Sequence, residues 1–189
     1  DNMILGNEVG GQAFFTQTGG TVAINSAGFG GYINNGINTF KGIPYAQAAR
    51  FMPPQKPAPW TGVRSSMTYG PVCPLIDPTT SVSDEIEFVF NHSWGYPNEN
   101  CLVLNVWTPG LNDGKKRPVM FYSHGGGFVI GSGGSAGQDG ANLARHFDVV
   151  VVETNHRLGL MGFLYLDELG GADYEGSGNN GILDIVEGL

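Results

Sequence analysis

The chain has 189 residues, enough for one domain with a sizeable core, and 41% of them are hydrophobic while only 14% are charged. Nine basic residues stand against 17 acidic ones, and the net charge of −8 without any basic run argues against binding to nucleic acid or to anionic lipid. No apolar stretch approaches the roughly 20 residues that span a bilayer.

The first half of the chain predicts short strands and loops. Residues 12–25 form two apolar segments around Gly19-Gly20, a pattern typical of a β-hairpin. Residues 28–36 are rich in glycine and asparagine and predict a loop. Residues 51–59 hold four prolines, which favour extended coil.

The second half alternates between strand and helix patterns. Residues 102–107 predict a strand and residues 118–122 a buried strand, and the β-branched run at 148–152 is typical of a central parallel strand. Helical spacing appears at 139–147 and again at 182–189, where the chain stops within the pattern. We therefore expect an α/β fold with a mixed, mostly parallel sheet and an antiparallel N-terminal hairpin.

The two cysteines, Cys73 and Cys101, leave two states open. They could form a disulfide in an oxidising compartment, or they could be free thiols in the cytosol. Their spacing does not suggest a zinc site.

A glycine-rich motif carries the clearest chemistry. His124-Gly125-Gly126-Gly127-Phe128 directly follows the apolar run that ends near Tyr122. Esterases and lipases place such a loop after a strand, because backbone N–H groups there stabilise the negative oxygen of the tetrahedral intermediate. The alternative is a glycine turn without chemistry, but the preceding strand favours an oxyanion loop.

Two other patterns in the next segment are weaker. Gly133–Gly137 fits G-x-S-x-G, yet no buried strand leads into Ser135 and no helix follows directly, so we do not expect Ser135 to be the nucleophile. Residues 131–136 also fit G-x-G-x-x-A with Glu153 about 20 residues later. This dinucleotide-binding fingerprint is disfavoured because the strand ends well upstream of its glycines.

Several ordered segments together resemble the type-B carboxylesterase/cholinesterase-like family of α/β-hydrolases. The matching segments are FKGIPYA at 40–46, ENCLVLNVWTP at 99–109, the glycine loop at 124–128, NHRLG at 155–159 and NGILD at 180–184. The sequence departs from the family pattern at Asn100, where aspartate is usual, and at His156, where tyrosine is usual.

The resemblance implies particular roles for several residues. It implies that Cys73 and Cys101 form a disulfide, which indicates a secreted, periplasmic or extracellular protein. It pairs Arg50 with Glu99 in a buried contact and assigns the oxyanion donors to the N–H groups of Gly126 and Gly127. Gly125 and Phe128 would lie at the bound substrate.

The resemblance also implies what the chain does and what it lacks. The expected activity is serine-dependent hydrolysis of carboxylic esters without a metal or organic cofactor. The serine, acid and histidine of the triad would lie beyond Leu189, so we expect residues 1–189 to be the N-terminal segment of a single catalytic domain. The expected partners are the C-terminal remainder and a small ester. The alternative function is a non-catalytic, cholinesterase-like binding or adhesion module.

Overall fold

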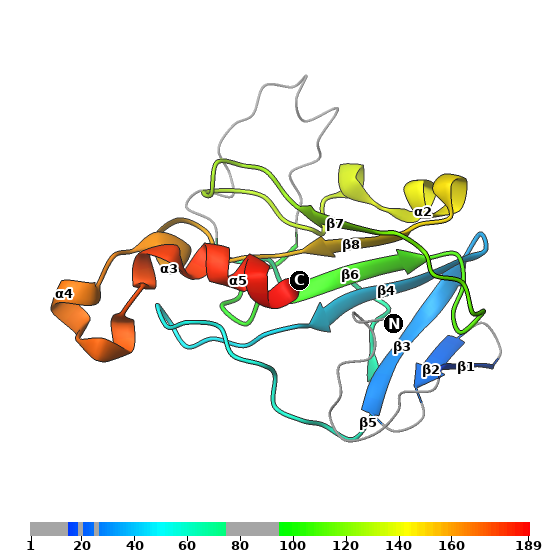
Figure 1. Ribbon diagram of the computed structural model, residues 1–189, viewed down its shortest axis with the longest axis horizontal. Coiled ribbons are helices and arrows are strands. Elements are labelled where there is room, and N and C mark those ends of the chain that lie inside the picture. The colour runs from blue at the N-terminus through cyan, green and yellow to red at the C-terminus, as the bar shows by residue number, and fades with distance from the viewer. Residues whose placement is uncertain (1–14, 19–20, 25–26, 75–94) are drawn as a thin grey trace.

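A computed structural model describes residues 15–18, 21–24, 27–74 and 95–189, and these residues build one mixed sheet (Figure 1). The strand order is β1-β2-β3-β4-β6-β8-β7, and β5 pairs with β3 beside this path. The strands are β1 (Phe15–Thr18), β2 (Thr21–Ile24), β3 (Ala27–Asn34), β4 (Ile37–Pro44), β5 (Gly62–Ser65), β6 (Val103–Thr108), β7 (Val119–Ser123) and β8 (Val150–Thr154).

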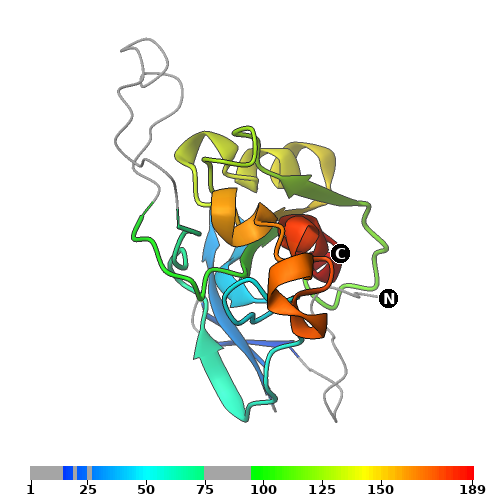
Figure 2. The ribbon, with the colours of Figure 1, turned by 90° about the vertical axis from the view of Figure 1, so that its left-hand side faces the viewer.

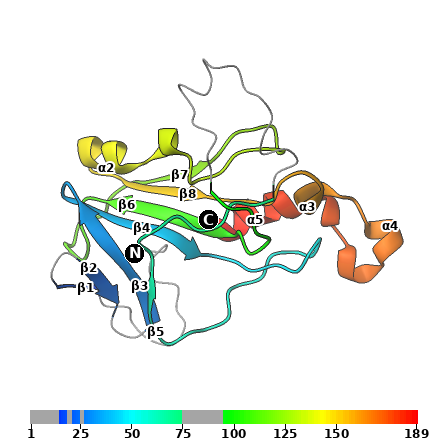
Figure 3. The ribbon, with the colours of Figure 1, turned by 180° about the vertical axis from the view of Figure 1, so that it is seen from behind.

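Helices connect and cover the C-terminal strands. They are α2 (Ala141–Phe147), α3 (Gly159–Phe163), α4 (Asp167–Gly170) and α5 (Asn180–Gly188), with short 3-10 turns at Ala136–Gln138, Ala172–Tyr174 and Ser177–Asn179. Helix α2 packs on β4, β6 and β8, whereas α3 and α4 extend from one end of the sheet (Figures 1 and 3). The predicted strands at 102–107, 118–122 and 148–152, the predicted helices at 139–147 and 182–189, and the N-terminal hairpin are thereby confirmed.

Hydrophobic side chains fill both faces of the sheet. On one face, Trp107 and Val151 pack with Ala144 of α2. On the other face, Phe40, Val106 and Val152 form a second cluster, and Gly188 of α5 approaches Thr154 and Phe121 there. Residues that alternate along a strand point to opposite faces, so α2 and α5 cover opposite sides of the sheet (Figure 2).

Three expectations about the sheet are wrong. Residues 28–36 are largely strand β3, and a Cβ atom at Gly31 would overlap the Thr39 carbonyl and the Phe40 ring, so the glycine serves close packing of strands. Strand β7 is mostly exposed, because β8 is the only strand beside it among the described residues.

The predominance of parallel pairing is the third wrong expectation. Only β7–β8 and β3–β5 are parallel in the described residues, and every other strand pair is antiparallel. Only two residues separate each of the strands β1 to β4 from the next, and connections this short allow only antiparallel neighbours. The connection through α2 is long enough to return the chain parallel to β7.

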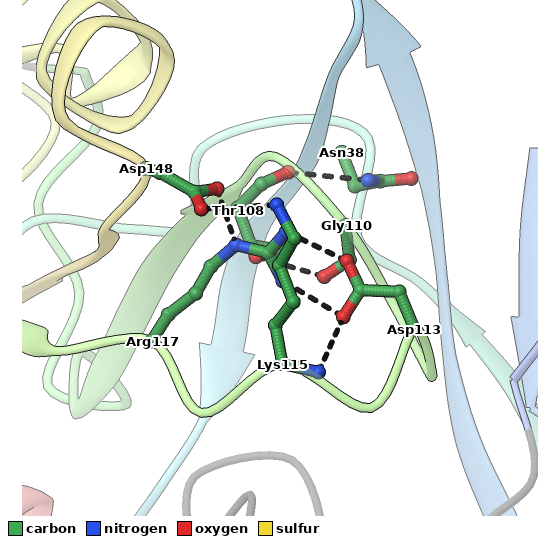
Figure 4. A network of polar contacts seen from close by, with 7 residues as sticks. All are labelled: Asn38, Thr108, Gly110, Asp113, Lys115, Arg117 and Asp148. Atoms are coloured by element: carbon green, nitrogen blue, oxygen red, sulfur yellow. Dashed lines mark hydrogen bonds and ion pairs between the residues drawn. The ribbon is translucent and has the colours of Figure 1, made fainter.

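Charged side chains anchor the connection between β6 and β7 (Figure 4). The Arg117 guanidinium donates to both carboxylate oxygens of Asp113, at 3.0 and 2.6 Å, and to Asp148 at 2.7 Å. Asp148 ends α2 in a left-handed conformation, with φ of 51°. These bonds hold the start of β7 against the turn that enters β8.

No helix in the described part of the chain is both long and apolar enough to cross a membrane.

Candidate functional site

The glycine motif follows the end of β7 and forms an exposed turn. Gly126, Gly127 and Phe128 all have positive φ, at 124°, 61° and 62°. The carbonyl oxygen of Gly126 accepts hydrogen bonds from the N–H groups of Val129 and Ile130, each at 3.2 Å. A Cβ atom at Gly126 would overlap the Ile130 carbonyl, so only glycine fits this position.

The N–H groups of Gly126 and Gly127 have no hydrogen-bond acceptor among the described residues. Both glycines are exposed, and the space that a Cβ atom would occupy at Gly127 is empty. Two adjacent free amides in an exposed turn can bind an anionic oxygen, because they require no reorganisation before they donate.

His124 supports the turn from inside. Its side chain is buried, and its Nδ1 lies 2.9 Å from the Gly125 carbonyl oxygen, which fits an N–H donor. Burial, with a smaller contribution from the nearby His156, lowers the pKa of His124 to about 4 against the opposing hydrogen bond to Gly125, so the ring is neutral at neutral pH. The buried ring therefore supports the backbone of the turn.

Phe128 links the turn to the segment after β8. Its carbonyl oxygen accepts a 2.7 Å hydrogen bond from the N–H of Gly159, and its ring meets that of Phe163 at 5.0 Å between centroids. The side chain remains 52% exposed. Phe128 therefore presents an apolar surface next to the two free amides.

The following glycine loop, residues 131–137, is built into the sheet rather than open for catalysis. Asn105 donates to the Gly133 carbonyl at 2.9 Å, and Asn155 accepts from the Gly133 N–H at 2.8 Å. Ser135 is 6% exposed, no strand runs into it, and a 3-10 turn follows it. This geometry is not that of a nucleophile elbow, as anticipated from the sequence.

The dinucleotide fingerprint also lacks its required geometry. Strand β7 ends at Ser123 and helix α2 begins at Ala141, so the glycines neither follow a strand nor open a helix. Glu153, the acidic residue of this pattern, is only 3% exposed within β8.

Glu153 instead belongs to a buried polar cluster on the sheet. Its Oε2 atom has no hydrogen-bond partner within the described ranges. Burial, together with the smaller effect of the Asp139 carboxylate, raises the pKa of Glu153 to about 8, although Lys41 opposes this rise. The Lys41 ammonium lies 3.8 Å from the centre of the Tyr69 ring and 4.0 Å from Asp139.

The cysteines and the Arg50–Glu99 pair lie away from the turn. Cys73 and Cys101 are joined in a disulfide and are both buried. Arg50 and Glu99 form a bidentate ion pair, but their side chains are 62% and 40% exposed, so the expected burial of this pair is wrong for the described chain. Both residues lie in turns outside the sheet, where little of the described chain covers them.

The sequence analysis missed two polar contacts that hold the region together. Arg157 and Asp184 form a buried ion pair, and Asn155 joins the glycine loop to the Pro71 carbonyl through a 2.9 Å hydrogen bond. Asn155 and Arg157 both lie in a polar run directly after the buried strand β8. That run was the feature of the sequence that could have indicated these contacts. In the described part of the chain, no three His, Cys, Asp or Glu side chains are grouped as metal ligands would be.

The chain is similar to known carboxylesterases in both sequence and structure. The model of the carboxylesterase family matches residues 19–189. Carboxylesterase 3B of Mus musculus is 39% identical over 166 residues, which cover 81% of this chain and 26% of that protein. Para-nitrobenzyl esterase of Bacillus subtilis (strain 168) is 37% identical over 164 residues, which cover 84% of this chain and 31% of that protein.

Solved structures give the same result. Carboxylesterase EST55 of Geobacillus stearothermophilus aligns with a TM-score of 0.72 and 42% identity, covering 84% of this chain and 30% of that one. An esterase from Clostridium hathewayi that can hydrolyse aliphatic aromatic polyesters aligns with a TM-score of 0.80 and 38% identity, covering 93% and 34%. The chain thus spans about a quarter to a third of the length of these proteins.

Proposed function

The chain belongs to the carboxylesterase family, and we propose that residues 1–189 are the N-terminal segment of a single catalytic domain that hydrolyses carboxylic esters. Its mixed, open sheet is the N-terminal part of the α/β-hydrolase fold. In the proposed reaction, a serine outside this segment attacks the ester carbonyl, a histidine accepts and returns the proton, and an acyl-enzyme forms and is hydrolysed.

In this proposal the segment supplies the oxyanion hole. The N–H groups of Gly126 and Gly127 donate to the carbonyl oxygen as it becomes negative in the tetrahedral intermediate. The observation that supports this role is their pair of exposed amides without an acceptor among the described residues, in a turn where position 126 admits only glycine. Gly125 and the exposed ring of Phe128 border the same turn and are proposed to contact the substrate.

The non-catalytic binding module is the weaker candidate. The relatives named above are esterases, and an adhesion surface has no need for two unobstructed backbone donors. We also propose that the protein is secreted or periplasmic, and the Cys73–Cys101 disulfide supports this location because such bonds persist in oxidising compartments.

The first experiment labels the complete protein with a fluorophosphonate probe and measures hydrolysis of a p-nitrophenyl ester. We expect one adduct on a serine outside residues 1–189, together with loss of hydrolysis. An adduct on Ser135 would contradict the assignment of the glycine loop. Absence of both adduct and hydrolysis would favour the binding module.

A pair of glycine variants tests the oxyanion role. Gly127→Ala forces alanine into a positive φ of 61° and should displace the amide. We expect kcat to fall by about ten- to a hundredfold, because complete loss of one oxyanion donor lowers kcat by about 10²–10³-fold. Gly36→Ala is the matched control, because Gly36 also has positive φ and open space but lies in the β3–β4 turn. Equal kcat in both variants would contradict the assignment of the Gly127 amide as an oxyanion donor.

A further inference from the structure

The rings of His124 and His156 stack against each other beneath the glycine turn. Their centroids are 4.5 Å apart and their planes differ by 10°. His124 is 7% exposed and His156 is 2% exposed, so protein surrounds the stack on its other sides. His156 holds its own ring orientation through Nδ1, which lies 3.1 Å from the Arg157 carbonyl oxygen.

Of the two stacked rings, that of His124 fills the inside of the turn. His124 Nδ1 bonds the Gly125 carbonyl, and Gly131 approaches the same ring so closely that a Cβ atom would overlap it. The loop therefore begins and ends against His124. Displacement of this ring would move the backbone between Gly125 and Gly131, which includes both free amides.

The His156 ring belongs to a different segment of the chain, which a buried ion pair anchors. His156 follows β8 directly, and its neighbour Arg157 is fixed by a buried ion pair with Asp184 of α5. The same segment also holds Phe128, through the Gly159 N–H and through an edge contact of the Phe128 ring with His156 at 6.3 Å. The flat face of His156 thus packs against His124 and supports the turn through that ring.

We propose that His156 is a positioning residue for the oxyanion turn: its ring supports His124 and thereby keeps the Gly126 and Gly127 amides in place. This inference rests on the proposed esterase function. Preorganised donors accelerate a reaction only while they are aimed at the developing charge, and a displacement of about 1 Å can cost about 10²-fold in rate. The proposed role requires a planar ring at position 156 and does not require a charge on it.

The test compares His156→Leu, which keeps an apolar volume but no flat ring, with His156→Phe, which restores the ring. In the complete protein, His156→Leu should lower kcat for a p-nitrophenyl ester about tenfold and change KM less than about twofold. His156→Phe should recover kcat to within about threefold of wild type. His146→Leu, at an exposed position of α2, is the matched control and should leave kcat unchanged.

A second readout does not depend on activity. The amides of Val129, Ile130 and Gly159 close the turn, so their hydrogen exchange should be about tenfold faster in His156→Leu than in wild type and near wild type in His156→Phe. If His156→Leu does not fold, His156→Gln is used for the same comparison.

The outcomes separate this inference from the proposed function. Unchanged kcat and exchange in folded His156→Leu would overturn the positioning role, as would a loss that His156→Phe fails to restore. A wild-type protein without ester hydrolysis would refute the proposed function, and the exchange rates alone would then decide whether His156 positions the turn.

Discussion

Arg157 and Asp184 form a bidentate ion pair that is almost completely buried. Arg157 Nε and Nη2 donate to the two carboxylate oxygens at 2.8 and 2.7 Å, and the Arg157 backbone N–H adds a third bond at 2.9 Å. The remaining guanidinium nitrogen donates to the Met52 carbonyl at 2.7 Å. The pair therefore joins three distant parts of the chain, at Met52, at Arg157 and in helix α5.

Removal of the carboxylate should strongly destabilise the protein. Asp184→Ala leaves the Arg157 charge buried without a partner, which costs about 3–5 kcal/mol of unfolding free energy. The measurement is the chemical denaturation curve of the complete protein. The double variant Arg157→Met/Asp184→Leu is the control, and it should recover much of the loss because no unpaired charge remains. Equal stability of Asp184→Ala and wild type would contradict this account.

The disulfide should stabilise the early part of the chain. Cys73 and Cys101 are 28 residues apart. Closing a loop of this length lowers the conformational entropy of the unfolded chain, which stabilises the folded state by about 3–4 kcal/mol. Cys73→Ser/Cys101→Ser should therefore lower the denaturation midpoint, and reductant should lower it in wild type to the same value. A midpoint that reductant does not change would show that the bond contributes little.

Local patterns predicted the elements of the sheet but not their packing. The apolar runs that became β6, β7 and β8 and the helical spacing of α2 depend on neighbours in sequence, and these predictions are confirmed. The glycines and asparagines of residues 28–36 suggested a loop, but the segment is largely strand. Glycine is needed at position 31 because Phe40 and Thr39 of the next strand approach it closely, and no local pattern reveals this contact.

The candidate site shows the same division. The glycine motif predicted a sharp turn after a strand, because glycine adopts positive φ angles, such as the 124° of Gly126, without steric cost. The stack of His124 on His156 and the bond from Arg157 to Asp184 join residues 32 and 27 positions apart, respectively. Such pairs depend on how strands and helices are placed in space, and a single sequence gives no measure of this.

Acid should weaken the fold through His124. Its pKa falls from about 6.5 to about 4 on folding, so between these values the unfolded chain binds a proton that the native chain does not. Stability is therefore full above about pH 6.5 and falls towards pH 4, by at most about 3 kcal/mol. His124→Asn should flatten this part of the curve of unfolding free energy against pH. His146→Gln, a change at an exposed histidine, should keep the wild-type slope.

Alkali should act in the opposite direction through Glu153. Folding raises its pKa from 4.5 to about 8, so between these values the native chain binds a proton that the unfolded chain lacks. This contribution is full below about pH 4.5 and is lost as pH rises to 8, by about 3–5 kcal/mol. Glu153→Gln keeps the shape without a titrating group and should remove the decline, as measured by denaturation between pH 5 and 9.

Asp139, which raises the pKa of Glu153 together with burial, gives a second test of this glutamate. Asp139→Asn removes the carboxylate that opposes ionisation of Glu153, while Lys41 still favours it. The decline should therefore end at a lower pH than in wild type, yet it should persist, because burial is the larger cause. A decline that Glu153→Gln leaves unchanged would assign the alkaline loss of stability to another group.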